Sequence, residues 1–274
     1  MEQIVQGVQD MTYLSWSLYR NSSGTAGSFL KSQEITSEGK IYYKLSRYDA
    51  RDGVIGHESV NEIIADRLLT ILDIPHIHYR LIHADILLDE KPIRTWLCSS
   101  LNFRQHGEKK HALDDYYRLG RLNSAESPLD FCIRNGWSEY IYQMLVFDYL
   151  ILNRDRHGAN IEVLENRYRK TIRLAPLFDN GVSLYSTCLT KDDLDRTDAM
   201  EDRPVQCFVG SRSAWENLKL IPHDRYPILG TLHETDRSRL LDGLEDALDP
   251  VWLKRCWDMI WRRWQAYEAF RNQR

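Results

Sequence analysis

Two aspartates and one asparagine near the middle of the chain have the residue types and the spacing that phosphoryl transfer from ATP requires. Asp155 lies within residues 153–157 (Asn-Arg-Asp-Arg-His), which follow an apolar run, and Asn160 comes five positions after it. A second aspartate, Asp179, lies within residues 177–181 (Leu-Phe-Asp-Asn-Gly). Such a reaction needs one carboxylate to meet the acceptor hydroxyl, and an amide and a second carboxylate to hold Mg²⁺.

We therefore predict that Asp155 is the catalytic carboxylate and that Asn160 and Asp179 bind Mg²⁺, which prefers hard oxygen ligands. His157 has two interpretations that the sequence leaves open: contact with the transferring phosphate, or packing of the loop. Asp and Asn also cap turns, so each residue alone is weak evidence and the ordered set supports the prediction.

A phosphate contact is predicted upstream, on a strand rich in aromatic and β-branched residues. Lys44 lies in the strand-like run 41–45, and a helix expected over residues 57–73 carries two glutamates. A strand lysine can pair with the α- and β-phosphates and be oriented by a helix carboxylate. We expect Glu62 to be that partner, with Glu58 as the second choice. The alternative is that Lys44 is a solvated surface lysine.

A short turn rich in glycine and serine precedes this strand at residues 21–28. We predict that the backbone N–H groups around Gly24, Gly27 and Ser28 cover the phosphates. The turn does not match the G-x-x-x-x-G-K-[ST] pattern, which excludes a Walker-type loop.

The elements that must position these residues divide the chain into a strand-rich first part and a helix-rich second part. Apolar residues recur at helical spacing over residues 57–73, and Pro75 closes that segment. From Asp114 onward the patterns are mainly helical, including a helix expected over Tyr140–Leu152. The expected strands are Tyr79–Leu88, Ile93–Leu101 and the two halves of a hairpin, Ile161–Leu164 and Thr171–Leu174.

We accordingly expect an N-terminal lobe over residues 1–101 and a helical C-terminal lobe over residues 102–274, with polar residues 102–110 as a hinge. The acidic segment 191–202 is expected to be an exposed loop. Four tryptophans follow residue 241 at helical spacing and are expected to face the core. They are Trp252, Trp257, Trp261 and Trp264.

The composition of the whole chain excludes several function classes. The 274 residues include 43% hydrophobic residues, which is enough for a sizeable core. A net charge of −4 gives no electrostatic case for nucleic-acid binding. Five widely spaced cysteines without a CxxC pair argue against a disulfide framework and against a zinc site. No apolar stretch reaches the ~20 residues of a membrane helix, and residues 1–10 lack the basic and apolar regions of a signal peptide, so we expect a cytoplasmic protein with no membrane partner.

At these residues the chain resembles the HipA-like kinases, bacterial serine/threonine kinases known from toxin–antitoxin modules. The motif that carries the resemblance is the segment 153–160 (Asn-Arg-Asp-Arg-His-Gly-Ala-Asn) followed by the segment 174–179 (Leu-Ala-Pro-Leu-Phe-Asp). Residues 57–75, which include Asn61 and Glu62, are similar to the helix of the family's N-lobe.

The resemblance implies an α+β, two-lobed protein-kinase-like fold that binds ATP between the lobes and uses Mg²⁺. By position it gives Asp155 the base role, Asn160 and Asp179 the metal roles, and Lys44 the nucleotide role. It also implies a protein serine or threonine as acceptor, of unknown identity, and an antitoxin as a candidate partner. Family members can phosphorylate a serine in their own glycine-rich loop, where this chain has Ser22, Ser23 and Ser28.

Two other functions stay open. A D-R-H-x-x-N loop also permits a small-molecule or lipid kinase, although the acidic segment 191–202 would be repelled by an anionic lipid surface. The second is a kinase-like module that binds a nucleotide or a partner without turnover. The intact set of Asp155, Asn160 and Asp179 weighs against that module.

Overall fold

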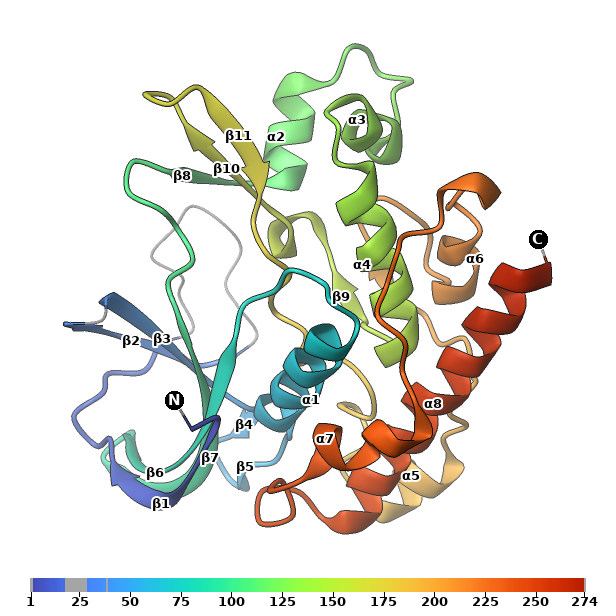
Figure 1. Ribbon diagram of the computed structural model, residues 1–274. Helices are drawn as coiled ribbons and strands as arrows, with labels where there is room; N and C mark the ends of the chain where they lie inside the picture. Colours follow the sequence, from blue (N-terminus) through green and yellow to red (C-terminus); the bar gives the residue numbers. More distant parts are fainter. Residues whose placement is uncertain (1, 18–28, 38, 274) are drawn as a thin grey trace.

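The N-terminal part of the chain is built around a five-stranded sheet. The computed structural model describes residues 2–17, 29–37 and 39–273 (Figure 1). The strands follow the order β1-β6-β7-β3-β2 across the sheet. Their bounds are β1 (Ile4–Asp10), β2 (Lys31–Thr36), β3 (Gly39–Leu45), β6 (Tyr79–Leu88) and β7 (Lys91–Leu101). A short hairpin of β4 (Tyr48–Asp49) and β5 (Gly53–Val54) leads into helix α1 (Glu58–Ile71).

A two-residue turn fixes the register of β6 and β7. Asp89 and Glu90 both have positive φ angles, 47° and 64°, and Leu88 pairs with Lys91. Two consecutive residues with left-handed backbone angles form the tight hairpin turn whose twist matches that of the two antiparallel strands it joins. β1 is the exception to the antiparallel pattern, since it pairs with β6 in parallel.

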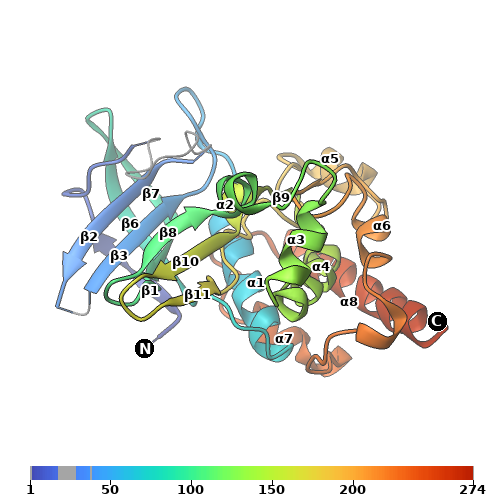
Figure 2. The same cartoon turned by 90° about the horizontal axis from the view of Figure 1, so that it is seen from above.

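Helix α1 lies between the sheet and the helical part of the chain (Figure 2). Only Arg67, Thr70 and Ile71 among its 14 residues are not buried. Because the helix is enclosed on nearly all sides, its polar side chains need hydrogen-bond or ion-pair partners from the protein rather than from water. Its apolar residues join one core that runs from Leu81 of β6 to the C-terminal helices.

The C-terminal part is mainly helical and carries a small three-stranded sheet of order β11-β10-β8. Its helices are α2 (Leu113–Gly120), α3 (Pro128–Arg134), α4 (Ser138–Ile151), α5 (Lys191–Arg196), α6 (Ala214–Leu218), α7 (Arg237–Leu241) and α8 (Pro250–Gln273). Its strands are β8 (Lys109–Ala112), β9 (Asp155–Arg156), β10 (Glu162–Asn166), β11 (Thr171–Leu174) and β12 (Gln206–Cys207). Three single-turn helices complete it: η1 (Gly158–Asn160), η2 (His223–Arg225) and η3 (Glu234–Asp236).

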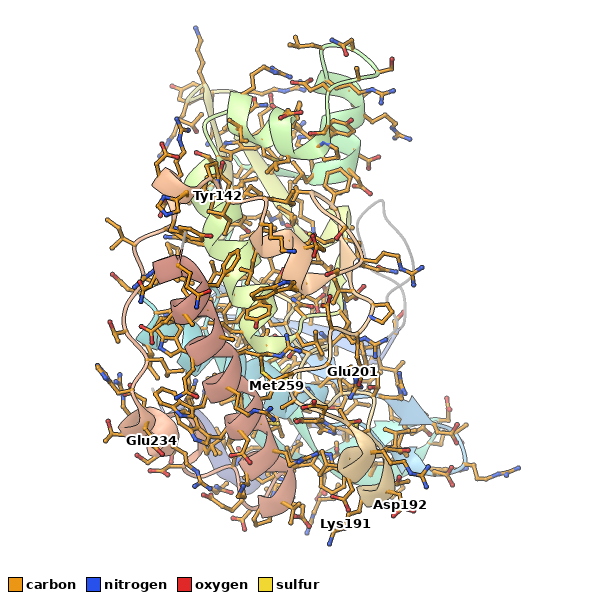
Figure 3. All side chains as sticks on the ribbon, turned by 90° about the vertical axis from the view of Figure 1, so that its right-hand side faces the viewer. Tyr142, Lys191, Asp192, Glu201, Glu234 and Met259 are labelled. Atoms are coloured by element: carbon orange, nitrogen blue, oxygen red, sulfur yellow. The ribbon has the colours of Figure 1, made fainter. Side chains whose placement is uncertain are left out.

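The central pair of this part is α4 and α8, which pack side by side (Figure 3). The tryptophan stripe of α8 faces the core as predicted, because Trp257 and Trp264 are buried and Trp252 and Trp261 pack against the same cluster. No helix within the described ranges combines the length and the apolar character needed to cross a membrane.

Most predicted elements are confirmed, including the strand-rich first part, the single long helix within it and the hairpin of β10 and β11. Two expectations were wrong. The acidic segment 191–202 is exposed but begins with helix α5, because Thr190 and Asp193 form a reciprocal cap at its start. The polar residues 102–110 are not all hinge, since Lys109 and Lys110 pair with β10. The division into two lobes between residues 101 and 102 stays a prediction.

Because α1 links the sheet and the helices through one core, we predict that the chain unfolds in a single cooperative transition. Leu68 is fully buried in that core, whereas Leu119 on α2 is 85% exposed. Leu68→Ala should lower the free energy of unfolding by about 2–5 kcal/mol, and the matched control Leu119→Ala should change it by less than about 0.5 kcal/mol. Denaturant titrations monitored by tryptophan fluorescence and by circular dichroism measure the free energy of unfolding of both variants. Two separate transitions in the wild type would contradict the prediction.

Candidate active site

A lysine from the sheet, a glutamate from α1 and an aspartate from the C-terminal part meet in one ionic cluster. Lys44 Nζ lies 3.0 Å from Glu62 Oε1 and 2.5 Å from Asp179 Oδ1. All three side chains are largely enclosed, with exposures of 12%, 0% and 13%. The expected partner Glu62 is thus in contact with Lys44. The second choice, Glu58, instead accepts a hydrogen bond from the backbone N–H of Arg47 at 2.9 Å.

The cluster keeps its lysine charged. Burial alone would lower the pKa of Lys44, but the carboxylates of Asp179 and Glu62 raise it above its ordinary value. Burial raises the pKa of Glu62, and the Lys44 ammonium opposes that shift. A buried carboxylate beside a fixed cation is the arrangement that orients a phosphate-binding lysine.

Helix α1 also holds the loop that carries Asp179. Glu62 Oε2 accepts from the backbone N–H of Asn180 at 2.8 Å. Asn61 Nδ2 donates to the carbonyls of Gly181 and Ser183 at 3.0 and 3.1 Å. A Cβ on Gly181 would lie only 3.0 Å from the backbone oxygen of Glu58, so glycine permits this close approach.

The orientation of Asp179 itself is fixed by its backbone. It has a φ of 56°, in the left-handed region that aspartate tolerates better than most residues. Its N–H donates to the hydroxyl of Tyr79, at the start of β6, at 3.1 Å. This backbone conformation directs the Asp179 carboxylate at Lys44. The sequence pattern did not predict the conformation.

Asp155 lies in β9, which pairs with β12 in parallel. Its side chain is 32% exposed, so an acceptor group can reach it. Asn160 Nδ2 donates to the backbone oxygen of Asp155 at 2.7 Å and lies 3.4 Å from its Oδ2. Burial raises the pKa of Asp155, the nearby His157 lowers it and Asp179 raises it, and the net shift is upward.

His157 has a role within the loop. Its Nδ1 accepts from the backbone N–H of Ala159 at 3.2 Å, and its Nε2 lies 3.6 Å from Asp155 Oδ1. These contacts place His157 at the start of the single turn η1 that ends at Asn160. They agree with the loop-packing interpretation, and contact with the transferring phosphate stays a prediction.

Arg156 connects the two loops of the site, and the sequence analysis did not identify it. Its guanidinium is buried and makes two hydrogen bonds to Asp148 of α4, both at 2.9 Å. The same group donates to the backbone oxygen of Phe178 at 2.8 Å and to Asn180 Oδ1 at 2.6 Å. The residues on either side of Asp179 are thereby tied to the loop of Asp155. The sequence did contain a signal for this contact. Asp148 lies in the otherwise apolar helix α4, and a buried carboxylate requires a cationic partner.

A cavity of about 1050 Å³ opens beside the ionic cluster. Lys44, Asp179 and Tyr79 line it, and residues 101–104 also belong to its wall. The rings of Phe103 and Phe178 stack with centroids 5.7 Å apart at this wall. The cavity has both apolar walls and charged groups, as small-molecule sites do, and its size suits a nucleotide.

The charges of the site suit a divalent cation. Two cations, Lys44 and Arg156, are outnumbered by four carboxylates, so the group has a net negative charge. The carboxylates are Glu62, Asp148, Asp155 and Asp179. Asn160 and Asp179 offer the oxygen donors that Mg²⁺ favours. The predicted phosphate-covering residues Gly24, Gly27 and Ser28 lie outside the described residues, as do Ser22 and Ser23.

No family model matches the chain, and no curated protein matches it. Among solved structures, it is similar to the Helicobacter pylori proinflammatory kinase CtkA, with a TM-score of 0.60, 15% sequence identity and 94% of each chain covered. It also matches HipA from a Shewanella oneidensis complex of HipA, HipB and operator DNA, at a TM-score of 0.42 and 15% identity, covering 91% of this chain and 58% of that one. The Neurospora crassa PAN3 pseudokinase matches at a TM-score of 0.30 and 11% identity, covering 95% of this chain and 61% of that one.

The match to CtkA covers nearly all of both chains and concerns the fold alone, because the sequence identity is low. It agrees with the strand-rich N-terminal sheet and the helical C-terminal part described above. The two-lobed, kinase-like fold expected from the sequence is thus confirmed, and this chain has a kinase-like fold.

Proposed function

We propose that this protein is an ATP- and Mg²⁺-dependent kinase that transfers the γ-phosphoryl group to a hydroxyl, most simply that of a protein serine or threonine. The observation that supports this is the contact of Lys44 with both Glu62 and Asp179, in a cavity that Lys44 and Asp179 line. This cluster joins the three parts of the chain that a phosphoryl-transfer site requires: a sheet lysine, a helix glutamate and the metal-binding loop.

Each residue has a separate task in this proposal. Lys44, oriented by Glu62, binds the phosphates of ATP that remain on the leaving group. Asp155 accepts the proton of the acceptor hydroxyl on a carboxylate oxygen as that hydroxyl attacks the γ-phosphorus. Asn160 and Asp179 would hold Mg²⁺, which when bound neutralises charge on the phosphates. The protein's contribution is mainly positioning and electrostatic stabilisation.

The burial of Asp155 agrees with its proposed role. A general base works best when its pKa lies closer to the operating pH than that of a free carboxyl group, and the pKa of Asp155 is raised. Its partial exposure leaves room for an acceptor larger than water. The acceptor, the antitoxin partner inferred from the resemblance and the lobe boundary at residues 101 and 102 all stay predictions.

A second candidate function is a nucleotide-binding module without turnover. The observation that favours it is the direct ion pair between Lys44 and Asp179, which occupies one oxygen of the carboxylate that Mg²⁺ would need. Incubation with γ-labelled ATP and Mg²⁺, followed by mass spectrometry of the protein and of an added lysate, tests both candidates. Label on a serine or threonine supports the kinase; nucleotide binding without transfer or hydrolysis supports the module.

We predict that Asp155→Asn lowers the turnover number by about 10²–10⁴-fold and leaves Mg·ATP affinity nearly unchanged, because it removes only the base. Asp179→Ala should instead weaken Mg²⁺-dependent nucleotide binding, because it removes the charged metal ligand. Single-turnover assays and calorimetric titration measure the two effects. Wild-type turnover in both variants would show that these loops do not form the site.

The activity should also depend on pH through Asp155. Its carboxylate form acts as the base, so kcat/KM should fall as the pH drops through the pKa of Asp155, which lies above the ordinary 3.8. The residual activity of Asp155→Asn should lack this acid limb. An acid limb that is identical in wild type and variant would assign it to another group.

Arg156 should act through structure. Arg156→Met leaves the Asp148 carboxylate buried without its cation, so we expect a loss of about 3–5 kcal/mol in the free energy of unfolding. The double variant Asp148→Asn with Arg156→Met should lose less than Arg156→Met alone. Arg154→Met is the matched control, since that neighbouring side chain makes only a 3.3 Å bond to Pro204 among the bonds described for it. Equal losses for Arg154→Met and Arg156→Met in denaturant titrations would contradict this account.

A further inference from the structure

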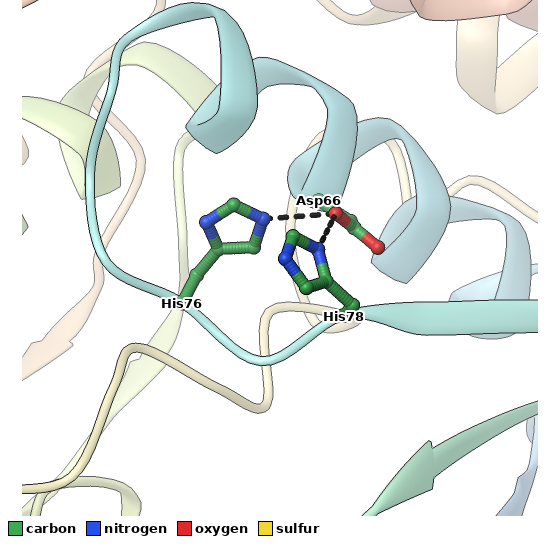
Figure 4. A group of neighbouring side chains, drawn as sticks. All are labelled: Asp66, His76 and His78. Atoms are coloured by element: carbon green, nitrogen blue, oxygen red, sulfur yellow. Dashed lines mark hydrogen bonds and ion pairs between the residues drawn. The ribbon is translucent and has the colours of Figure 1, made fainter.

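A second cluster of side chains with ligand atoms begins one helical turn beyond Glu62, at Asp66 on α1. Asp66 Oδ1 lies 2.8 Å from His76 Nε2 and 3.1 Å from His78 Nδ1 (Figure 4). The three ligand atoms all lie within 4.8 Å of one another. Neither histidine belongs to the proposed kinase site, so the cluster needs an explanation of its own.

The hydrogen bonds of His76 direct its Nε2 at a carboxylate oxygen. Its Nδ1 lies 2.6 Å from the backbone oxygen of Ile74, so Nδ1 carries a hydrogen. On the other side, Nε2 lies 2.8 Å from Asp66 Oδ1, and the Thr70 hydroxyl is farther away at 3.3 Å. A neutral His76 would therefore direct its lone pair at other lone pairs, and a cation must lie between them: either a proton or a metal ion.

A metal ion accounts for both histidine contacts at once. Hydrogen bonds explain the two edges only as separate contacts, whereas one metal ion would explain why His76 and the exposed His78 both turn a ring nitrogen to the same carboxylate oxygen. Tetrahedral zinc with bonds of ~2.0–2.2 Å keeps its ligand atoms ~3.3–3.5 Å apart. To reach this spacing, the 2.8 Å edge would widen by roughly 0.5–0.7 Å and the 3.1 Å edge by roughly 0.2–0.4 Å.

The surroundings of the cluster are those of an oriented metal site. The second oxygen of Asp66 is held by the backbone N–H of Tyr79 at 2.7 Å and by Gln3 Nε2 at 3.2 Å, which leaves Oδ1 for the ion. His76 donates its other N–H to a backbone carbonyl, the usual arrangement for a metal-binding histidine. His76 and Asp66 are nearly enclosed, and His78 is 77% exposed and gives the ion a way in.

We propose that Asp66, His76 and His78 bind one divalent transition-metal ion of the zinc class, with water as the fourth ligand. Two imidazole nitrogens and one carboxylate oxygen suit such an ion better than Mg²⁺ or Ca²⁺. The ion would join α1 to the residues that lead into β6, and so fix the helix that carries Glu62. The absence of a CxxC pair argued against zinc from the sequence, but this set contains no cysteine.

The test is a titration of the chelator-treated full chain with Zn²⁺ by calorimetry and with Co²⁺ by absorption spectroscopy. We expect one ion per chain and visible Co²⁺ bands without thiolate charge-transfer absorption. His78→Ala removes a ligand that is mostly exposed, so the variant should fold and lose affinity by about 100-fold or more. His223→Ala removes another exposed histidine, outside the cluster, and should bind like wild type.

Thermal unfolding gives an independent readout that does not require kinase activity. Zn²⁺ should raise the midpoint of unfolding of the wild type and of His223→Ala, but raise it less in His78→Ala. Three results would overturn the proposal: no stoichiometric binding to the wild type, equal binding to the wild type and His78→Ala, or a thiolate band in the Co²⁺ spectrum. The first of these would identify the cluster as an aspartate–histidine hydrogen-bond network alone.

Discussion

Glu62 is a carboxylate with no exposed surface, and its burial constrains much of what surrounds it. A buried carboxylate costs several kcal/mol unless a cation and hydrogen-bond donors surround it. Here the cation comes from β3 as Lys44 and a backbone donor comes from Asn180. One side chain of α1 thereby ties the sheet, the helix and the loop of Asp179 together. A shift of α1 would leave charges without partners on both sides, so we infer that the packing of this helix determines whether the site is assembled.

Arg156 is a second buried charge that is surrounded by partners, on the other side of the site. Its guanidinium is buried against Asp148 and also reaches Phe178 and Asn180. The loop of Asp155 and the loop of Asp179 are thus attached to different elements, α4 and α1, and are joined by one cation. Asp155 can remain partly exposed and available to an acceptor because Arg156, rather than Asp155 itself, joins the loops.

The residues of the site that could be predicted from the sequence are those whose chemistry is rare at such positions. A lysine in an apolar strand and an Asp-x-x-x-x-Asn pattern after an apolar run are recognisable without coordinates, as are helix α1 and the hairpin of β10 and β11. The contacts of Arg156 and Asn61 could not be predicted because charged and amide residues in a loop or on a helix are usually solvated, and only tertiary contacts reveal their burial. β8 and α5 were misassigned because strand pairing across sequence and a reciprocal cap can override a polar composition. The cluster of Asp66, His76 and His78 was missed because helix α1 and the segment after it meet only in the fold.

The claim on which the proposed function depends is that Lys44 contacts the phosphates of a nucleotide. An acyl-phosphate derivative of ATP, which acylates a lysine beside the bound phosphates, tests this on the unmodified protein. Peptide mass spectrometry should find the label on Lys44, and excess Mg·ATP should suppress it, while the exposed Lys91 stays unlabelled or labels at a rate that Mg·ATP does not change. Absence of label on Lys44, or labelling that Mg·ATP does not suppress, would contradict the account.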